Sequence, residues 1–345
     1  MPALRAARLR AGWVAGGAVA VAGATLLGLA VGPVSLSPVE VARELFDRLP
    51  LVDVDSGLTD RQAAIVWELR LPRVVLGLLV GALLSLAGGS YQGVFRNPLA
   101  DPYLLGVAAG AGLGATVAIS YGLGTGSGFL DPLPLSAFAG ALVAVGLTYL
   151  LGARDRRPAT LILAGVAMAS FFTALQTFVQ QRHSETLRQV YSWILGRLGT
   201  AGWGEVRLLV PYAIVAGAVL LAHRRALDVL SVGDDEASAL GLHPQRTRRL
   251  VVAAASLGTA AAVSVSGLIG FVGIIVPHTI RLLAGTSYRV ILPLSVLFGA
   301  AFLALADLLA RMALAPAEIP IGVITAFFGA PFFVVVLRRG RGVVD

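Results

Sequence analysis

The side chains that most often do chemistry are absent from this sequence or too far apart to act together. The chain has no cysteine, and all 27 of its basic residues are arginine. Cysteine nucleophiles, thiolate metal sites, Schiff-base lysines and the lysine of a phosphate-binding loop are therefore excluded. The four histidines lie in separate segments without metal-ligand spacing: His183, His223, His243 and His278. We expect no metal site, no bound cofactor and no enzyme activity in this chain, so any ATP hydrolysis must belong to another one.

Charged side chains gather instead in one stretch, residues 228–249, which we call the elbow. Asp234 and Asp235 occupy positions typical of a helix N-cap, where acidic charge is favoured. Gly241 suits the left-handed position that ends a helix, and Pro244 suits the first position of the next one. The pattern predicts two short helices joined by a bend. It is either a solvated loop that follows the positive-inside rule or a docking knob for a soluble partner.

The composition places these residues in a polytopic membrane protein. The chain is 57% hydrophobic and 13% charged, with a mean hydropathy of +0.83, whereas soluble domains carry roughly 25% charged residues. The net charge of +8 does not indicate a nucleic-acid partner, because the arginines follow the expected membrane topology.

Apolar runs predict an all-α membrane protein with about ten spans and both termini in the cytoplasm. The chain forms one transmembrane domain, residues 1–345, with an external loop at 33–69 and the elbow on the cytoplasmic side. A signal peptide is the alternative for the first run, and we favour a retained span. The expected spans are 11–31, 73–95, 103–121, 135–151, 159–180, 206–222, 250–265, 268–283, 290–312 and 321–337.

Smaller features add detail to this topology. Two capping boxes are expected in the external loop, one beginning at Ser37 and one at Thr59. Residues 183–199 are expected to form an amphipathic helix at the outer interface, with Tyr191 on its apolar face. Glycines spaced four apart in the second and third spans predict close helix contacts.

The fifth predicted span differs from the others because polar residues run down one of its faces. Their three- and four-residue spacing places them on a single stripe. They either hold helices together through hydrogen bonds or line a water-accessible path. The stripe consists of Ser170, Thr173, Thr177 and Gln180.

Four further stretches carry a resemblance to a known family. They are LRLPR at 69–73, RNPLADPYLLG at 96–106, GLIGFVGIIVPH at 267–278 and EIPIGVITAFFGAP at 318–331. With the elbow, they resemble the permease subunits of the iron-siderophore, haem and cobalamin ABC importers. The resemblance implies the type II ABC importer permease fold in the plasma (inner) membrane of a prokaryote. It also implies a permease dimer, two ATPase subunits that bind ATP and Mg²⁺, a substrate-binding protein, and a metal chelate as cargo.

The resemblance also implies roles for individual residues. Arg70, Arg73 and Arg311 match external arginines that receive acidic residues of the binding protein. The alternative is local pairing, of Arg70 or Arg73 with Glu68 and of Arg311 with Asp307. The elbow residues expected to couple to the ATPase are Asp234, Asp235, Glu236, Ala237, Leu240 and Gly241.

Asn97 and Leu99 match a cytoplasmic gate of that family, although an Asn-Pro pair can simply form a turn. The other functional class that we consider is a stand-alone secondary transporter. Such a protein normally keeps ionisable residues inside the membrane for ion coupling. Asp307 is the one acid within a predicted span core, which argues against that class. A membrane enzyme or scaffold is disfavoured because no catalytic cluster is present.

Overall fold

A computed structural model of the chain describes residues 9–48, 54–123, 131–152, 158–199 and 202–340, which are helical with no β-strand. Ten of the helices correspond to the predicted spans. They are α1 Ala11–Ala30, α4 Leu71–Phe95, α5 Val107–Ser120, α6 Pro132–Gly152, α7 Pro158–Arg182, α9 Trp203–Ala222, α12 Pro244–Ser266, α13 Val272–Ala284, α14 Tyr288–Met312 and α15 Ile321–Gly340.

Shorter helices join these ten. At one end of the bundle lie α2 Pro38–Asp47, α3 Asp60–Ala64, a π-helical segment Ile65–Arg70, a 3₁₀ turn Ser184–Thr186 and α8 Leu187–Ile194. At the other end lie α10 Arg224–Leu230 and α11 Asp234–Ala239.

Seven of the ten helices are long and apolar enough to cross a bilayer by themselves, and α5, α13 and α15 are shorter apolar helices. Two of the short helices begin four residues later than the sequence pattern indicated. Gly106 before α5 and Phe271 before α13 have positive φ, of 80° and 68°. This left-handed backbone interrupts the helical path, so the apolar run starts as a turn.

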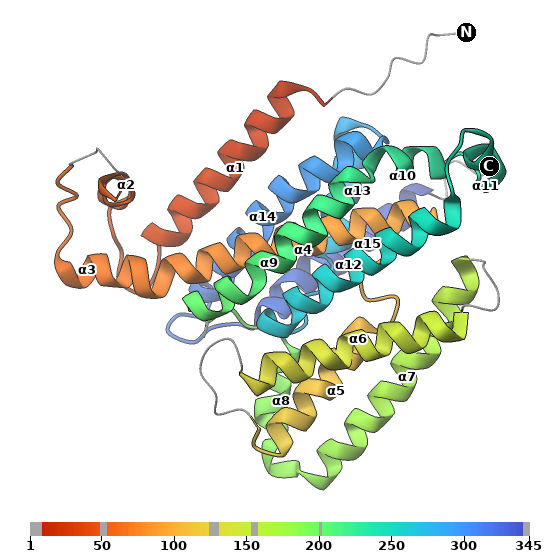
Figure 1. The fold of residues 1–345 in the computed structure, drawn as a ribbon. Coiled ribbons are helices and arrows are strands. Elements are labelled where there is room, and N and C mark those ends of the chain that lie inside the picture. The colour runs from red at the N-terminus through yellow and green to blue at the C-terminus, as the bar shows by residue number, and fades with distance from the viewer. Residues whose placement is uncertain (1–8, 49–53, 124–130, 153–157, 200–201, 341–345) are drawn as a thin grey trace.

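The helices form two groups, with α4 and α14 at the centre of the larger one (Figure 1). There α4 packs against α9, α12, α13 and α14, and α1 lies along α14. The second group consists of α5, α6, α7 and α8, and α6 joins it to α12. This leaves α7 with most of its side chains outside the core.

Glycine pairs allow the closest helix contacts, as the spacing predicted. A side chain at Gly81 of α4 would collide with the backbone of Gly299 in α14. In the second group, side chains at Gly110 of α5 and Gly140 of α6 would each collide with the carbonyl of the other. These are backbone-to-backbone contacts that a β-carbon would prevent.

Several local predictions were only partly right. The capping box at Thr59 is present, but Ser37 caps α2 without any side-chain hydrogen bond. In α8 the buried aromatic residue is Trp193, because the helix is rotated so that Tyr191 is 54% exposed. In the elbow, Gly233 is the N-cap of α11, so Asp234 and Asp235 lie in its first turn.

The ten helices that match predicted spans give the molecule two distinct ends. At the elbow end, α10 lies beside the start of α14 and the end of α4, and α11 lies beside α12 (Figure 1). At the opposite end, which we call the arginine end, α3 leads into α4 and α14 leads into α15. Because the number of crossings is even, α1 begins and α15 ends at the elbow end (Figure 1).

Candidate functional site

The elbow projects from the bundle and presents both acidic and apolar side chains. In α11, Asp235 and Glu236 are exposed. Val232 before the helix and Leu240 after it are 67% and 71% exposed. Gly241 has φ +81°, which confirms the predicted left-handed stop. Ala237 is fully buried in the core, so it anchors the helix and presents no contact surface.

Asp234 fixes the elbow to the transmembrane helices through two arginines. Its carboxylate accepts hydrogen bonds from both terminal nitrogens of Arg248 in α12, at 2.6 Å each. Arg96, directly after α4, pairs with the same carboxylate and donates to the carbonyl of Leu230 at 2.8 Å. The hydrogen bonds from Arg248 lower the pKa of Asp234, so this carboxylate is ionised at neutral pH.

Asp228 makes a second attachment, to the start of α14. It accepts hydrogen bonds from the hydroxyl of Ser287 at 2.7 Å and from the amide of Tyr288 at 2.6 Å. Arg289 lies 3.4 Å away as an ion-pair partner. A carboxylate at a helix N-terminus is favoured by the free N–H groups and the helix dipole. The elbow is therefore attached to the start of α14 as well as to the end of α4.

The sequence prediction included Asp234 but missed Arg96, Arg248 and Asp228. The sequence did place all three residues in stretches that were already singled out. Arg96 begins the RNPLADP stretch, and Arg248 and Asp228 lie within residues 228–249. Their partners lie farther along the chain than a local pattern covers: Arg96 and Asp234 are 138 residues apart, Asp228 and Tyr288 are 60 apart, and Arg248 and Asp234 are 14 apart.

The predicted gate residues lie in the turn that follows α4. The side-chain oxygen of Asn97 accepts a hydrogen bond from the amide of Leu99 at 2.9 Å. This is the turn geometry that an Asn-Pro pair favours. Asn97 is exposed and Leu99 is half-buried. Arg96 directly precedes these two residues and also pairs with Asp234 of the elbow, so the same arginine connects the turn to the elbow.

The three predicted docking arginines come together at the arginine end, but two of them are buried. Arg70 and Arg311 are each 6% exposed. Arg70 donates to the carbonyls of Leu29 at 2.6 Å, Ala30 at 3.1 Å and Val34. These bonds hold the end of α1 against the start of α4.

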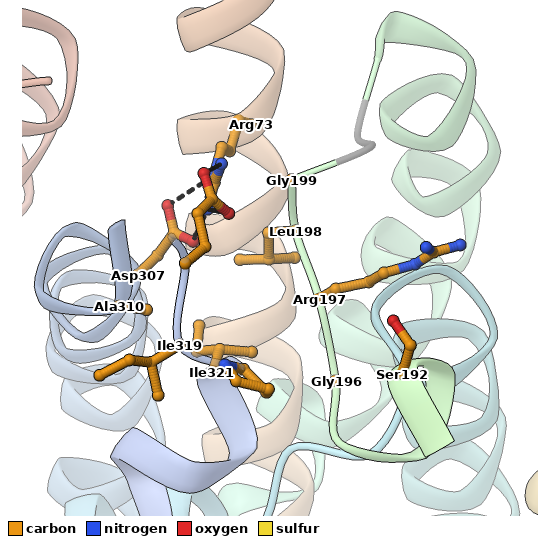
Figure 2. Close-up of a pocket in the computed structure, with 12 residues that line it drawn as sticks. Arg73, Ser192, Gly196, Arg197, Leu198, Gly199, Asp307, Ala310, Ile319 and Ile321 are labelled. Atoms are coloured by element: carbon orange, nitrogen blue, oxygen red, sulfur yellow. Dashed lines mark hydrogen bonds and ion pairs between the residues drawn. The ribbon is translucent and has the colours of Figure 1, made fainter. Parts of the chain in front are cut away.

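Arg311 and Arg73 share one acidic partner, Asp307. Arg311 lies 3.3 Å from Asp307 one turn earlier, the local pairing that the sequence had left open, and donates to the carbonyl of Gly28 at 3.1 Å. Arg73 pairs with Asp307 and Glu318, both at 2.8 Å, and not with Glu68. Figure 2 shows Arg73 and Asp307 on one side of a surface cavity of about 330 Å³.

Glu318 is the accessible member of this cluster, with 47% of its side chain exposed. The hydrogen bond from Arg73 lowers the pKa of Glu318, which keeps it ionised beside the cavity. Binding-protein docking by Arg70, Arg73 and Arg311 stays a prediction.

The polar stripe of α7 lies on the surface of the single chain. Ser170, Thr173 and Thr177 are exposed, and Gln180 is half-buried. The hydroxyls of Ser170 and Thr177 donate hydrogen bonds to backbone carbonyls of α7 one turn earlier, at 3.0 and 2.9 Å. Within the described ranges, these two hydroxyls therefore do not hydrogen-bond to another helix.

No group of three or more histidine or acidic side chains that could hold a metal ion occurs among the residues that the structure describes. Asp234 is paired with two arginines, and Asp228 is held by the Ser287 hydroxyl and the Tyr288 amide. The contacts described at the two ends are ion pairs and hydrogen bonds.

Comparisons with known proteins agree with this geometry. The family model of the FecCD transport family matches residues 21–339. A cobalamin import system permease protein from Halobacterium salinarum is 43% identical over 284 residues, 82% of this chain and 75% of that protein. A vitamin B12 import system permease protein from Shigella boydii is 38% identical over 291 residues, 84% of this chain and 88% of that one.

Solved structures give the same answer for the fold. A metal-chelate type ABC transporter in an inward-facing conformation superposes with a TM-score of 0.84 at 31% identity, covering 96% of this chain and all of that one. The match confirms the ABC importer permease fold predicted from the sequence. The family model spans nearly the whole described chain, and the curated permeases cover four-fifths of it, so this polytopic membrane protein belongs to the FecCD transport family.

Proposed function

We propose that this chain is the membrane-embedded permease of a binding-protein-dependent ABC importer for a metal chelate of the ferric siderophore, haem or cobalamin kind. The observation that carries the proposal is the elbow. It exposes Glu236, Val232 and Leu240 to a partner, while Asp228 and Asp234 attach it to α14 and α4. A rigidly mounted, exposed knob suits the transfer of force from a separate motor.

On this proposal, two ATPase subunits hold the elbows of two permease copies on the cytoplasmic side. ATP and Mg²⁺ bind to those subunits and not to this chain. Closure of the ATPase pair shifts each elbow, and the anchors at Arg96 and Asp228 pass the shift to the start of α14 and the turn at Asn97 and Leu99. That turn then opens or closes the inner end of the path.

The arginine end would face outward and meet the substrate-binding protein. Arg73 and Glu318 line the cavity there, and an acidic side chain of the binding protein can compete with Glu318 for Arg73, because guanidinium groups pair readily with carboxylates. Arg70 and Arg311 contribute by fixing α1 to α4 and α14, so that the docking surface keeps its shape.

The path itself would lie between two copies, with the stripe of α7 facing it. Thr173 and Thr177 offer hydroxyls and no charge. An uncharged polar lining suits a bulky chelate that must pass without being held. Two relatives, a cobalamin import permease and a metal-chelate type ABC transporter, favour cargo of this size and kind.

A stand-alone secondary transporter is the weaker alternative. Asp307, the acid in a span core, is paired with Arg73 and Arg311. A carboxylate held by two guanidinium groups is a poor carrier of protons or sodium ions.

The decisive experiment is reconstitution in proteoliposomes with the cognate ATPase and binding protein. Uptake of the chelate that the binding protein retains should require all three components and ATP. The matched control is the permease alone under an ion gradient. Uptake by the permease alone, driven by that gradient, would exclude the proposed function.

A further inference from the structure

A second cavity at the arginine end is lined by two arginines that have no acidic partner. Its volume is about 580 Å³, and it lies between α8 and the outer end of α5. Arg188 of α8 and Arg197 of the following loop line it, together with the polar side chains of Gln189 and Ser192. No acidic side chain is part of its lining, and Ser192 and Arg197 also border the first cavity, where Asp307 and Glu318 are paired with Arg73.

Both guanidinium groups are available to a ligand. Arg188 and Arg197 are exposed. Within the described ranges, neither guanidinium has an ion pair or hydrogen bond, in contrast to Arg70, Arg73 and Arg311. Figure 2 shows Arg197 extending away from the Arg73–Asp307 pair, on the same side as Ser192.

The local charge distribution favours an anion in this cavity. A concave site lined by charge of one sign concentrates ions of the opposite sign and speeds their capture. Arginine pairs with carboxylates and phosphates through two parallel hydrogen bonds. Arginines on the expected outer side also run against the positive-inside bias, which indicates that they serve a purpose there.

The position of the cavity connects it to the proposed path. The stripe of α7 ends at Gln180, and the 3₁₀ turn Ser184–Thr186 then leads directly into α8. Thr186 and Ser120 share a hydrogen bond of 3.2 Å, which fixes this turn to the end of α5. Cargo that enters the path along α7 would therefore pass this cavity first.

We infer that the cavity bearing Arg188 and Arg197 is an entry site for an anionic group, a carboxylate or a phosphate, of the transported chelate. The inference rests on the proposed function. The concave shape favours a small-molecule group over a protein side chain, since its volume is within the range of about 300–1,000 Å³ typical of ligand pockets.

The absence of native cysteine permits a direct test on the purified full chain in lipid nanodiscs. Gln189→Cys places one thiol in this cavity, because Gln189 lines it and does not line the first cavity. Its rates of modification are measured with two methanethiosulfonate reagents, one anionic and one cationic. We expect the ratio of the anionic to the cationic modification rate to be about tenfold higher at this position than at Ala313→Cys, a cysteine at the same end of the molecule. The preference should disappear when Arg188→Gln and Arg197→Gln are added.

Two controls sharpen this test. Arg182→Gln removes an exposed charge at the same end but outside the lining, and should leave the preference intact. Citrate, as a carboxylate probe, should slow modification more than sodium chloride at equal ionic strength. The inference would be overturned if the double substitution left the preference for the anionic reagent unchanged. It would also be overturned if citrate and sodium chloride slowed the modification of the cysteine equally.

A further measurement separates cargo from binding protein and from the proposed function. In the reconstituted importer, the double variant should raise the KM for uptake while leaving the affinity for the ligand-free binding protein unchanged. Loss of that affinity would assign the arginines to docking and overturn the inference. Failure of the unmodified chain to support uptake would refute the proposed function, whereas the cysteine result would still report on the cavity.

Discussion

At the scale of single residues, Asp234 is the clearest candidate for a coupling role. Its carboxylate joins three segments, since it lies in α11 and pairs with Arg96 after α4 and Arg248 in α12. It is 40% exposed, and ion pairs that reach water contribute only about 0.2–1 kcal/mol to stability. Its importance would therefore be seen in transmission of movement more than in folding.

Asp234→Asn is expected to reduce ATP-driven uptake several-fold with a small change in melting temperature. The substitution keeps the size of the side chain but removes the charge that both arginines share. Asp60→Asn is the matched control, because Asp60 is also an aspartate in the first turn of a short helix, α3, but lies at the opposite end from the elbow and is exposed. Equal uptake by the two variants in reconstituted vesicles would contradict a coupling role for Asp234.

The lowered pKa of Asp234 also predicts how the elbow responds to pH. A carboxylate whose pKa is depressed in the folded state contributes stability above its unfolded pKa, and loses it only as pH falls through the folded value. The ordinary value is 3.8, so the attachment should be constant at neutral pH. ATPase stimulation measured at pH 6 and pH 8 should show no change caused by this group; a change that Asp234→Asn abolishes would contradict the assignment.

At the scale of elements, the elbow presents apolar side chains that the chain itself leaves uncovered. Val232→Ser with Leu240→Ser is expected to weaken ATPase binding at least tenfold, because burying one such side chain is worth about 1.5–3 kcal/mol. Val39→Ser is the control, since Val39 is 59% exposed on α2 at the opposite end. The affinity can be measured by titration of the detergent-solubilised complex. Unchanged affinity would remove these residues from the interface.

The contact between α5 and α6 gives a stability prediction. Gly110→Ala should lower the melting temperature, because its methyl group would collide with the Gly140 carbonyl and overpacking typically costs about 1–3 kcal/mol. Gly146→Ala in α6 has open space around it and should be nearly neutral. Thermal unfolding of the two variants in the same detergent provides the comparison.

The sequence predicted elements better than contacts, and the arginines show why. The lengths of the apolar runs alone placed all ten of these helices, since a bilayer fixes how many residues cross it. It could not show that Arg70 reaches the carbonyls of α1 or that Arg73 pairs with Glu318, 245 positions away. The starts of α5 and α13 were also missed, because a positive φ at Phe271 depends on tertiary packing that local propensity does not report.

At the scale of the whole molecule, one face remains to be covered. Only 11% of the residues in the most apolar stretch of α7 are buried within the chain. Large side chains of α7 and α15 point outward, with Phe178 62% and Phe327 75% exposed. Exposed phenylalanine is compatible with lipid, but a polar stripe beside it is costly there. A second copy that faces α7 would place the stripe in water and the phenylalanines in the contact.

This arrangement can be tested because the chain has no cysteine to interfere. Thr177→Cys should be joined to its counterpart by a short bifunctional maleimide in native membranes. Val19→Cys is the matched control, since Val19 is 72% exposed on α1, in the other helix group (Figure 1). Cross-linking at position 19 without cross-linking at position 177 would place the dimer contact on α1. The path would then no longer run along α7, and the entry site at Arg188 and Arg197 would lose its connection to it.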